Sequence, residues 1–275
     1  MKGIDVSDNQ GYIDWPKVKA DGVKFAILRS TRGSGIPDKQ LASNIKGCIE
    51  SGIPFDFYKY MYATTVEKAK SEAEKVVEVL LSLGIVPSKN TYIWGDVEDK
   101  TLKALSKQKL TDVVKAFKSV ILASGFSFGL YMGKYDYESL ELDVKQFEDH
   151  IWLARYYKRY TTMDFSENPN NGYEPKALAG SLWGWQYTSS GRVNGINGDV
   201  DLDIAYYDIK ETEVQTQYYQ TPEFTLIDSL NKIGEDSSYK NRSLIAAKNG
   251  ISGYKGTEEQ NLIMLDLLLE GKLIK

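Results

Sequence analysis

The chain has 275 residues, of which 26% are charged and 12% are aromatic, and its formal net charge is −4. This length accommodates one large domain with a sizeable core and a small accessory unit. A single cysteine, Cys48, excludes an intrachain disulfide framework and a multi-cysteine zinc cluster. A single histidine, His150, excludes mechanisms that need two. Carboxylates are therefore the expected reactive groups, and we expect neither a metal nor a cofactor.

The mild negative charge gives no global attraction for nucleic acid or anionic membranes. The sequence also contains no run of about 18 apolar residues. We therefore expect neither a nucleic-acid partner nor membrane insertion. No apolar segment precedes the first strand-like run at Gly3, which predicts synthesis in the cytoplasm without a signal peptide.

Eight short β-rich runs occur in the first 208 residues, and helical patterns separate the early ones. The runs are Gly3–Val6, Phe25–Ser30, Pro54–Tyr62, Thr91–Val97, Phe128–Met132, Ile151–Tyr156, Leu182–Tyr187 and Asp199–Ile204. Helical periodicity is found in Lys39–Ser51, Val66–Leu83 and Leu110–Ala123, whereas Tyr160–Lys176 has the composition of a long loop. Alternating strands and helices predict a parallel sheet. Eight strands predict an α/β fold of the (β/α)8-barrel type, irregular in its second half.

The composition changes after this region. Residues 209–223 are rich in Thr, Gln and Glu and are predicted to be a linker. Residues 224–275 are predicted to form a small helical domain. Thr257 and Gln260 match a capping box that opens a helix ending at Glu270. Because this helix has apolar residues on nearly all sides, we expect the domain to dock on the barrel or to self-associate.

The strongest local feature is the pair of acids in Asp96-Val97-Glu98. Alternation along a strand places Asp96 and Glu98 on one face, and the carboxyl end of a barrel strand opens into the active-site mouth. Because the two charges repel each other, one carboxyl can keep its proton near neutral pH, which suits general acid catalysis of glycosidic cleavage. The alternative is an exposed acidic strand end of the kind common in α/β proteins.

Two more acids lie at the ends of the predicted barrel. Asp5 ends the first strand, and Asp201 lies in the last strand, where Asp199, Asp201 and Asp203 alternate on one face. Strands one and eight are neighbours in a closed barrel, so Asp5 and Asp201 are expected to converge. The alternative for the aspartate run is calcium binding, although the run lacks EF-hand spacing and its distal Glu.

Aromatic residues near several strand ends predict platforms for sugar rings, whose C–H faces pack on flat aromatic surfaces. About half of the five tryptophans are expected to line the groove, and the others to belong to an aromatic core. The candidate substrate-binding residues are Tyr58, Tyr60, Tyr131, Trp152, Tyr156, Trp185 and Gln186.

The first 208 residues resemble glycoside hydrolase family 25, the muramidases that cut peptidoglycan glycan chains. The resemblance rests on several segments in a fixed order. They are Asp5–Gly11 with Ile13–Trp15, the Asp-x-Glu of residues 96–98, Trp185–Tyr187 and Val200–Asp203. It implies a flattened, irregular (β/α) barrel with a groove at the carboxyl ends of the strands, and a catalytic domain at residues 1–208.

The resemblance implies catalytic roles for Asp5, Asp96, Glu98 and Asp201 in cutting the β-1,4 bond between N-acetylmuramic acid and N-acetylglucosamine. Glu98 is the expected acid. Asp96 is expected to stabilise positive charge on the sugar or to orient its N-acetyl group. Sequence alone leaves substrate assistance, a carboxylate nucleophile and inversion open. Two other hypotheses are a non-catalytic wall-binding protein on this scaffold and a chitinase-like glycosidase.

Two positions depart from the family pattern. Arg32 replaces the usual acid after the second strand, and Lys59 replaces the usual histidine in the third. We expect these cations to alter a subsite or the preferred peptidoglycan decoration and not to abolish hydrolysis.

The tail resembles short C-terminal repeats of phage and bacterial wall hydrolases, which implies a wall-binding role for residues 224–275. The matching segments are Asn249–Ile251, Tyr254–Thr257, Gln260–Asn261 and Gly271–Leu273. A wall hydrolase with such a tail and no signal peptide is expected to be a phage endolysin of a Gram-positive host, released at lysis through a membrane hole. The alternative is a bacterial autolysin that is exported by another route.

Overall fold

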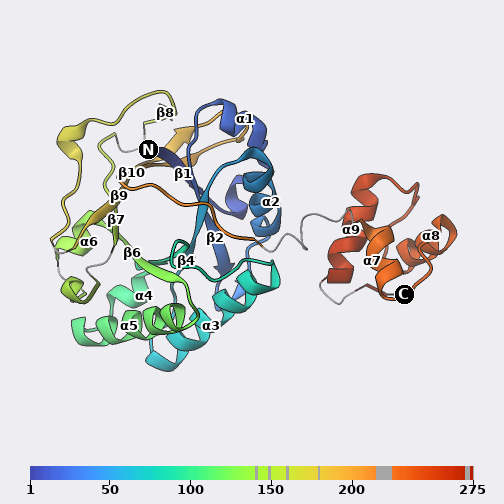
Figure 1. The fold of residues 1–275 in the computed structure, drawn as a ribbon, viewed down its shortest axis with the longest axis horizontal. Helices are drawn as coiled ribbons and strands as arrows, with labels where there is room; N and C mark the ends of the chain where they lie inside the picture. The colour runs from blue at the N-terminus through green and yellow to red at the C-terminus, as the bar shows by residue number, and fades with distance from the viewer. Residues whose placement is uncertain are drawn as a thin grey trace. The chain divides into compact units, whose positions relative to one another are not determined.

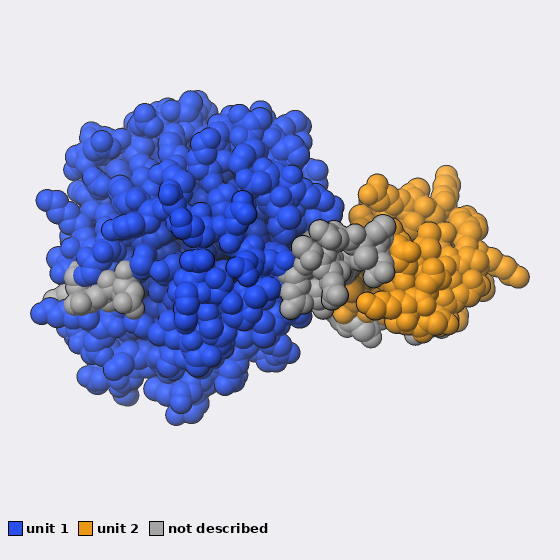
Figure 2. Space-filling view, in the orientation of Figure 1, with its two compact units in different colours: residues 1–215 blue, residues 216–275 orange. Residues whose placement is uncertain are grey.

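The structure is a computed structural model that describes residues 1–139, 142–147, 150–158, 161–178, 180–214, 225–269 and 273–274. The chain divides into two compact units, Met1–Gln215 and Thr216–Lys275, which are coloured separately in Figure 2.

Unit 1 is a closed eight-stranded barrel surrounded by helices and loops (Figure 1). Its strands are β1 (Lys2–Val6), β2 (Ala26–Arg32), β4 (Phe55–Tyr60), β5 (Tyr92–Asp96), β6 (Ser127–Gly133), β7 (Ile151–Ala154), β9 (Leu182–Arg192) and β10 (Val200–Ala205). The sheet runs β1-β10-β9-β7-β6-β5-β4-β2 and closes through the pairing of β1 with β2. The predicted α/β barrel is thus confirmed. Two short strands, β3 (Ile36–Pro37) and β8 (Met163–Asp164), pair outside this ring.

Helices cover the first half of the barrel more completely than the second. The connections contain α1 (Trp15–Ala20), α2 (Leu41–Ser51), α3 (Val66–Ser82), α4 (Lys100–Lys103), α5 (Lys107–Ala123) and the short α6 (Lys134–Glu138). Helices α3 and α5 lie side by side on the outside of the sheet (Figure 1). Within residues 161–176 the only regular elements are β8 and the 3-10 turn Asn171–Tyr173, as expected for the predicted long loop. Tyr160 lies outside the described residues.

Local side-chain chemistry sets the ends of these helices. The side chain of Thr65 accepts a hydrogen bond from the Lys68 amide at the start of α3, and Ser106 caps α5 in the same way. Gly52 ends α2 in the left-handed conformation with φ 60°, which costs glycine little because it has no Cβ.

The last strand differs from the predicted parallel sheet. β10 runs antiparallel to both of its neighbours, β1 and β9, whereas β1, β2, β4, β5, β6, β7 and β9 pair in parallel. The physical reason is the connection: residues 193–199 form a short link without a helix, and a parallel crossover needs a longer one.

Aromatic side chains fill the barrel interior. Trp94, Trp152 and Trp183 are all buried, and the rings of Trp94 and Trp183 have centroids 4.4 Å apart. Tyr131 packs on Trp152 at the same centroid distance of 4.4 Å. The interior is therefore a packed hydrophobic core up to the level of the acidic residues at the carboxyl ends of the parallel strands.

The first part of the predicted linker packs on the barrel. Ile209 is buried, Thr212 Oγ1 donates to the Phe55 carbonyl, and Val214 bridges to Ile85. Residues 209–214 are therefore anchored to unit 1. Residues 215–223 lie outside the described residues, as does the Phe224 predicted to begin the tail.

In the described part of unit 2 there are three helices, α7 (Leu226–Lys232), α8 (Tyr239–Lys248) and α9 (Glu258–Leu269). The capping box is present: Gln260 N donates to Thr257 Oγ1 and Thr257 N to Gln260 Oε1. The unit has its own small core, made of Leu226, Leu230, Ile245, Ala246, Tyr254, Met264 and Leu265. Glu270, the predicted helix end, lies outside the described residues.

A substitution at Gly129 on β6 tests how closely the barrel interior is packed. A Cβ at this position would lie 2.2 Å from Trp94 Cε3, and the indole of Trp94 is buried and packed against Trp152 and Trp183. We expect Gly129→Ala to lower the free energy of unfolding by about 1–3 kcal/mol, the usual cost of overpacking. Urea unfolding of the purified variant measures it.

Gly133→Ala is the matched control on the same strand. Its φ of −61° suits alanine, and the nearest atom to its Cβ is the end of the Asp136 side chain at 3.3 Å. Equal unfolding midpoints for the two variants would contradict the packing described here.

Candidate active site

The predicted acidic residues come together at one end of the barrel. Asp5 lies near the carboxyl end of β1, and Asp96 ends β5. Because β10 is antiparallel, Asp201 near its beginning reaches the same end, and its Cα is the register partner of Asp5. Glu98 follows β5 by two residues and is half-buried. Residues from both ends of unit 1 therefore form one carboxylate cluster.

Burial dominates the electrostatics of this cluster. Asp5 and Asp96 are each 5% exposed. Burial raises the pKa of Asp96 well above its usual range, and the nearby charge of Glu98 raises it further. Burial also raises the pKa of Glu98, while the cation of Lys103 opposes that shift. For Asp201, burial and then the charge of Asp5 raise the pKa. The cluster therefore holds protons at a pH where separate carboxyls would be ionised.

Gln186 connects the cluster to two tyrosines. Its Nε2 donates to Asp5 Oδ2 at 2.8 Å, and its Oε1 accepts from the hydroxyls of Tyr131 at 2.8 Å and Tyr156 at 2.7 Å. Gln186 is 3% exposed, so these bonds lie in a water-poor setting. Gln186 thus orients Asp5 and does not face solvent.

The two tryptophans predicted to bind sugar do not present open faces. Trp152 is 1% exposed and Trp185 is 0% exposed. Trp185 Nε1 donates to the Arg155 carbonyl, and Trp152 Nε1 to Asp203 Oδ1. The prediction that these rings act as platforms is wrong for this structure, because Trp152 packs in the barrel interior and Trp185 is buried against Tyr187. All five tryptophans are buried.

Three of the four tyrosines predicted to bind substrate are more exposed than the two tryptophans. Tyr58, Tyr60 and Tyr156 are half-buried, whereas Tyr131 is buried. The charges of Asp5 and Asp96 act on Tyr58, whose pKa is raised well above its usual value, chiefly by burial. Tyr58, Tyr60 and Tyr156 therefore keep part of their side chains exposed.

Sequence reasoning missed one member of the site. Asp203 is 0% exposed and contacts the cluster from inside the barrel, where burial raises its pKa well above the usual range. Its alternation with Asp201 was the available signal. Asp199, the third acid of that run, is exposed and pairs with Arg192 outside the cluster.

The two departures from the family pattern lie in different places. Lys59 is 0% exposed and pairs with Glu72 of α3 at 3.2 Å, so it lies between the sheet and the helix layer. The expectation that Lys59 alters a subsite is therefore wrong. Arg32 ends β2 at the carboxyl side of the barrel, and its Nη1 lies 3.5 Å from Asp8 Oδ2.

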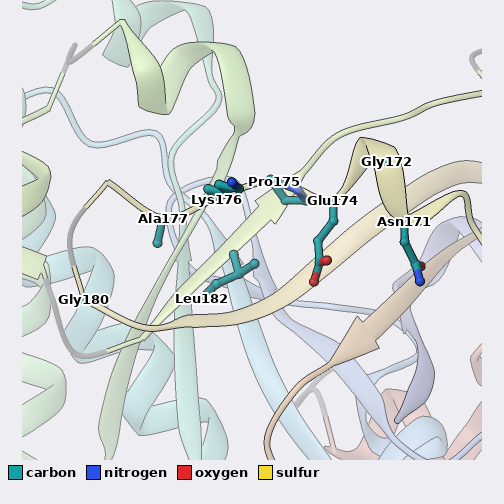
Figure 3. Close-up of a pocket in the computed structure, with 8 residues that line it drawn as sticks. All are labelled: Asn171, Gly172, Glu174, Pro175, Lys176, Ala177, Gly180 and Leu182. Atoms are coloured by element: carbon teal, nitrogen blue, oxygen red, sulfur yellow. The ribbon is translucent and has the colours of Figure 1, made fainter.

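A separate cavity of about 480 Å³ lies beside the loop that leads to β9 (Figure 3). It is lined by Asn171, Gly172, Glu174, Pro175, Lys176, Ala177, Gly180 and Leu182. Leu182 begins β9, so the cavity lies toward the opposite end of the barrel from the carboxylates. It contains none of the predicted site residues.

The described ranges contain no group of three or more His, Cys, Asp or Glu side chains arranged to hold a metal ion. No helix in the same ranges is long and apolar enough to cross a membrane.

Paired carboxylates at the mouth of an irregular (β/α) barrel are an arrangement typical of glycoside hydrolases. The model of the glycosyl hydrolases family 25 matches residues 4–196, and the chain belongs to this family. The match ends before β10, so the family model does not cover Asp201. Its place in the carboxylate cluster rests on the pairing of β10 with β1.

Similar proteins include lysozymes and wall-lytic proteins. The chain is 28% identical to an autolytic lysozyme of Clostridium acetobutylicum over 204 residues, 74% of this chain and 55% of that protein. It thus spans about half the length of that curated relative.

Two solved structures share the fold at 26% identity. The modular autolysin LytC of Streptococcus pneumoniae has a TM-score of 0.60, with 74% of this chain and 46% of that chain covered. LytC has also been solved with a synthetic peptidoglycan ligand. The catalytic domain of endolysin ply40, from bacteriophage P40 of Listeria monocytogenes, has a TM-score of 0.59, with 76% and 94% covered.

The raised pKa of Asp96 implies that the stability of the folded chain depends on pH. The unfolded chain ionises its aspartates near the ordinary value of 3.8, whereas folded Asp96 keeps its proton to higher pH. The folded state therefore binds more protons in this interval, and stability falls as pH rises through it. We expect Asp96→Asn to raise the thermal midpoint at pH 7 by about 2–4 °C, the shift that 1 kcal/mol causes at this size, and to have little effect at pH 4.

Asp99→Asn is the control, because Asp99 is close in sequence but its pKa is lowered, mainly by its hydrogen bond with Thr101. Thermal unfolding across pH compares the three proteins. A pH-independent effect of Asp96→Asn would contradict the electrostatic explanation.

Proposed function

We propose that this chain hydrolyses the β-1,4 bond between N-acetylmuramic acid and N-acetylglucosamine in peptidoglycan, as a lysozyme-type muramidase. The observation that carries the proposal is the convergence of Asp5, Asp96, Glu98 and Asp201 at the mouth of a family 25 barrel. The similarity to an autolytic lysozyme and to LytC, which was solved with a peptidoglycan ligand, supports this substrate class.

Glu98 is the proposed general acid. It is half-buried, so it reaches the mouth, and burial raises its pKa, which favours the protonated form that a general acid needs. Asp96 lies deeper, and its Oδ1 has no hydrogen-bond partner among the described residues. That oxygen is available to stabilise charge on the sugar or to orient its N-acetyl group.

Asp5 and Asp201 are proposed to position this pair and to tune its ionisation. Asp5 is held by Gln186, and the charges of both Asp5 and Asp201 raise the pKa of Asp96. Tyr58, Tyr60 and Tyr156 are the proposed sugar contacts. The buried Trp152 and Trp185 support the site from the core.

Glu98→Gln tests the proposed acid. The amide keeps the size of the side chain but carries no transferable proton, so we expect a loss of wall-clearing activity of at least about 100-fold. The fold should be retained, because Glu98 follows β5 and is not part of the core. Turbidity of purified Gram-positive walls measures the rate, and circular dichroism checks the fold.

Asp99→Asn is the matched control, since Asp99 is the adjacent carboxylate and is expected to leave the rate within about twofold of wild type. Clearing by Glu98→Gln at the wild-type rate would refute the assignment. Mass spectrometry of the released ends separates the alternatives. N-acetylmuramic acid ends support the muramidase, N-acetylglucosamine ends from chitin support a chitinase-like enzyme, and binding without release supports a wall-binding protein.

A phage endolysin acting on a Gram-positive host is the proposed biological setting, supported by the similarity to endolysin ply40. The similarity to an autolytic lysozyme favours a bacterial autolysin as the alternative. Expression in a Gram-positive cytoplasm tests this. An endolysin leaves cells intact until the membrane is permeabilised, whereas an autolysin reaches the wall fraction without that treatment.

Unit 2 is proposed to hold the enzyme on the wall. It has a core of its own, and Leu262 and Leu269 on α9 are about half or more exposed, at 50% and 65%. We expect full-length Glu98→Gln to sediment with purified walls and a chain ending at residue 215 to stay mostly in solution. Equal sedimentation would contradict a wall-binding role. Size-exclusion chromatography of the full chain tests self-association.

A further inference from the structure

Asp203 is a buried acid that the proposed mechanism does not use. It lies on β10, with its Cα paired to Gly3 of β1 on one side and to Gln186 of β9 on the other. Asp201 pairs with Asp5 at the mouth, so Asp203 lies two residues deeper in the barrel. At 0% exposure it has no route to contact a substrate.

The contacts of Asp203 leave one oxygen unsatisfied. Trp152 Nε1 donates to Oδ1 at 3.0 Å, whereas Oδ2 is buried and has no hydrogen-bond partner among the described residues. An ionised carboxylate with an orphaned buried oxygen is costly. A proton between Asp203 and the neighbouring Asp5 removes that cost, because each carboxyl then has a partner.

The groups around Asp203 provide no counter-charge. Asp5 faces it from β1, Asp201 from its own strand, and Tyr187 from β9. The contact from β7 is the neutral indole of Trp152. Three carboxyls in such a setting cannot all ionise near neutral pH, since each new charge is added next to an existing one.

We propose that Asp203 is a positioning residue that shares a proton with Asp5 and thereby couples the ionisation of Asp5 and Asp201 to a carboxyl hidden in the barrel. The catalytic consequence rests on the proposed function. The shared proton itself is a property of the folded chain. The charge of Asp203 raises the pKa of Asp5 in addition to the effect of burial.

The indole N–H of Trp152 is a direct reporter of Asp203. In ¹⁵N-labelled full-length protein, the Trp152 signal is assigned with Trp152→Phe and followed from about pH 4 to pH 9. Coupled carboxyls titrate in separate macroscopic steps, so we expect at least two steps in the wild type and one step fewer in Asp5→Asn. A Trp152 signal that is constant, or that titrates identically in both proteins, overturns the proposal.

Asp56→Asn is the matched control. Asp56 is also buried, at 1% exposure, and accepts from the Tyr92 amide on the neighbouring strand, away from the mouth. Burial raises its pKa to about 7, so it titrates in the same interval. We expect this variant to keep every step of the Trp152 titration.

Asp203→Asn tests the effect on the reaction. The amide keeps an acceptor for Trp152 and offers Asp5 an N–H donor, so Asp5 should ionise at lower pH. The charge of Asp5 raises the pKa of Asp96, so an Asp5 that ionises at lower pH should move the acid limb of the pH–rate profile up by about one unit. We expect the plateau rate to stay within about threefold of wild type. An unmoved acid limb overturns the coupling to catalysis. If neither protein cleaves walls, the proposed function fails, and the Trp152 titration still decides the shared proton.

Discussion

The pairing of β1 with β10 is the constraint on which the rest of the molecule depends. It closes the barrel, and its register places Asp5 opposite Asp201 although 195 residues separate them in the chain. The same pairing buries Asp203, which lies two residues deeper in the barrel than Asp201. Because burial removes water from all three carboxyls, the strand register that completes the fold also sets the protonation of the site.

Much of the architecture followed from local patterns. The eight strands were predicted from short β-rich runs, and the convergence of Asp5 with Asp201 followed from closure alone. The reversal of β10 was missed, since strand alternation is the same for parallel and antiparallel neighbours. Only the length of the 193–199 connection carried that information.

The candidate site was predictable in its acids and less so in its aromatic residues. Asp96 and Glu98 share a strand face, and alternation makes that visible. Trp152 and Trp185 were misplaced because an aromatic ring near a strand end suits both a groove and a core. The cation at Lys59 was equally ambiguous, and only its buried pairing with Glu72 of α3 shows that it serves the sheet–helix interface.

The antiparallel direction of β10 also determines at which end of the barrel the chain leaves the sheet. Met1 and Ala205 exchange backbone hydrogen bonds. The chain then contacts Phe55, which begins β4, and Ile85, which lies between α3 and β5. A parallel β10 would have ended at the mouth. As built, a segment joined after residue 214 starts at the far end of the barrel from the carboxylates. Both ends of the described part of unit 1, Met1 and Val214, therefore lie at the end of the barrel opposite the carboxylates.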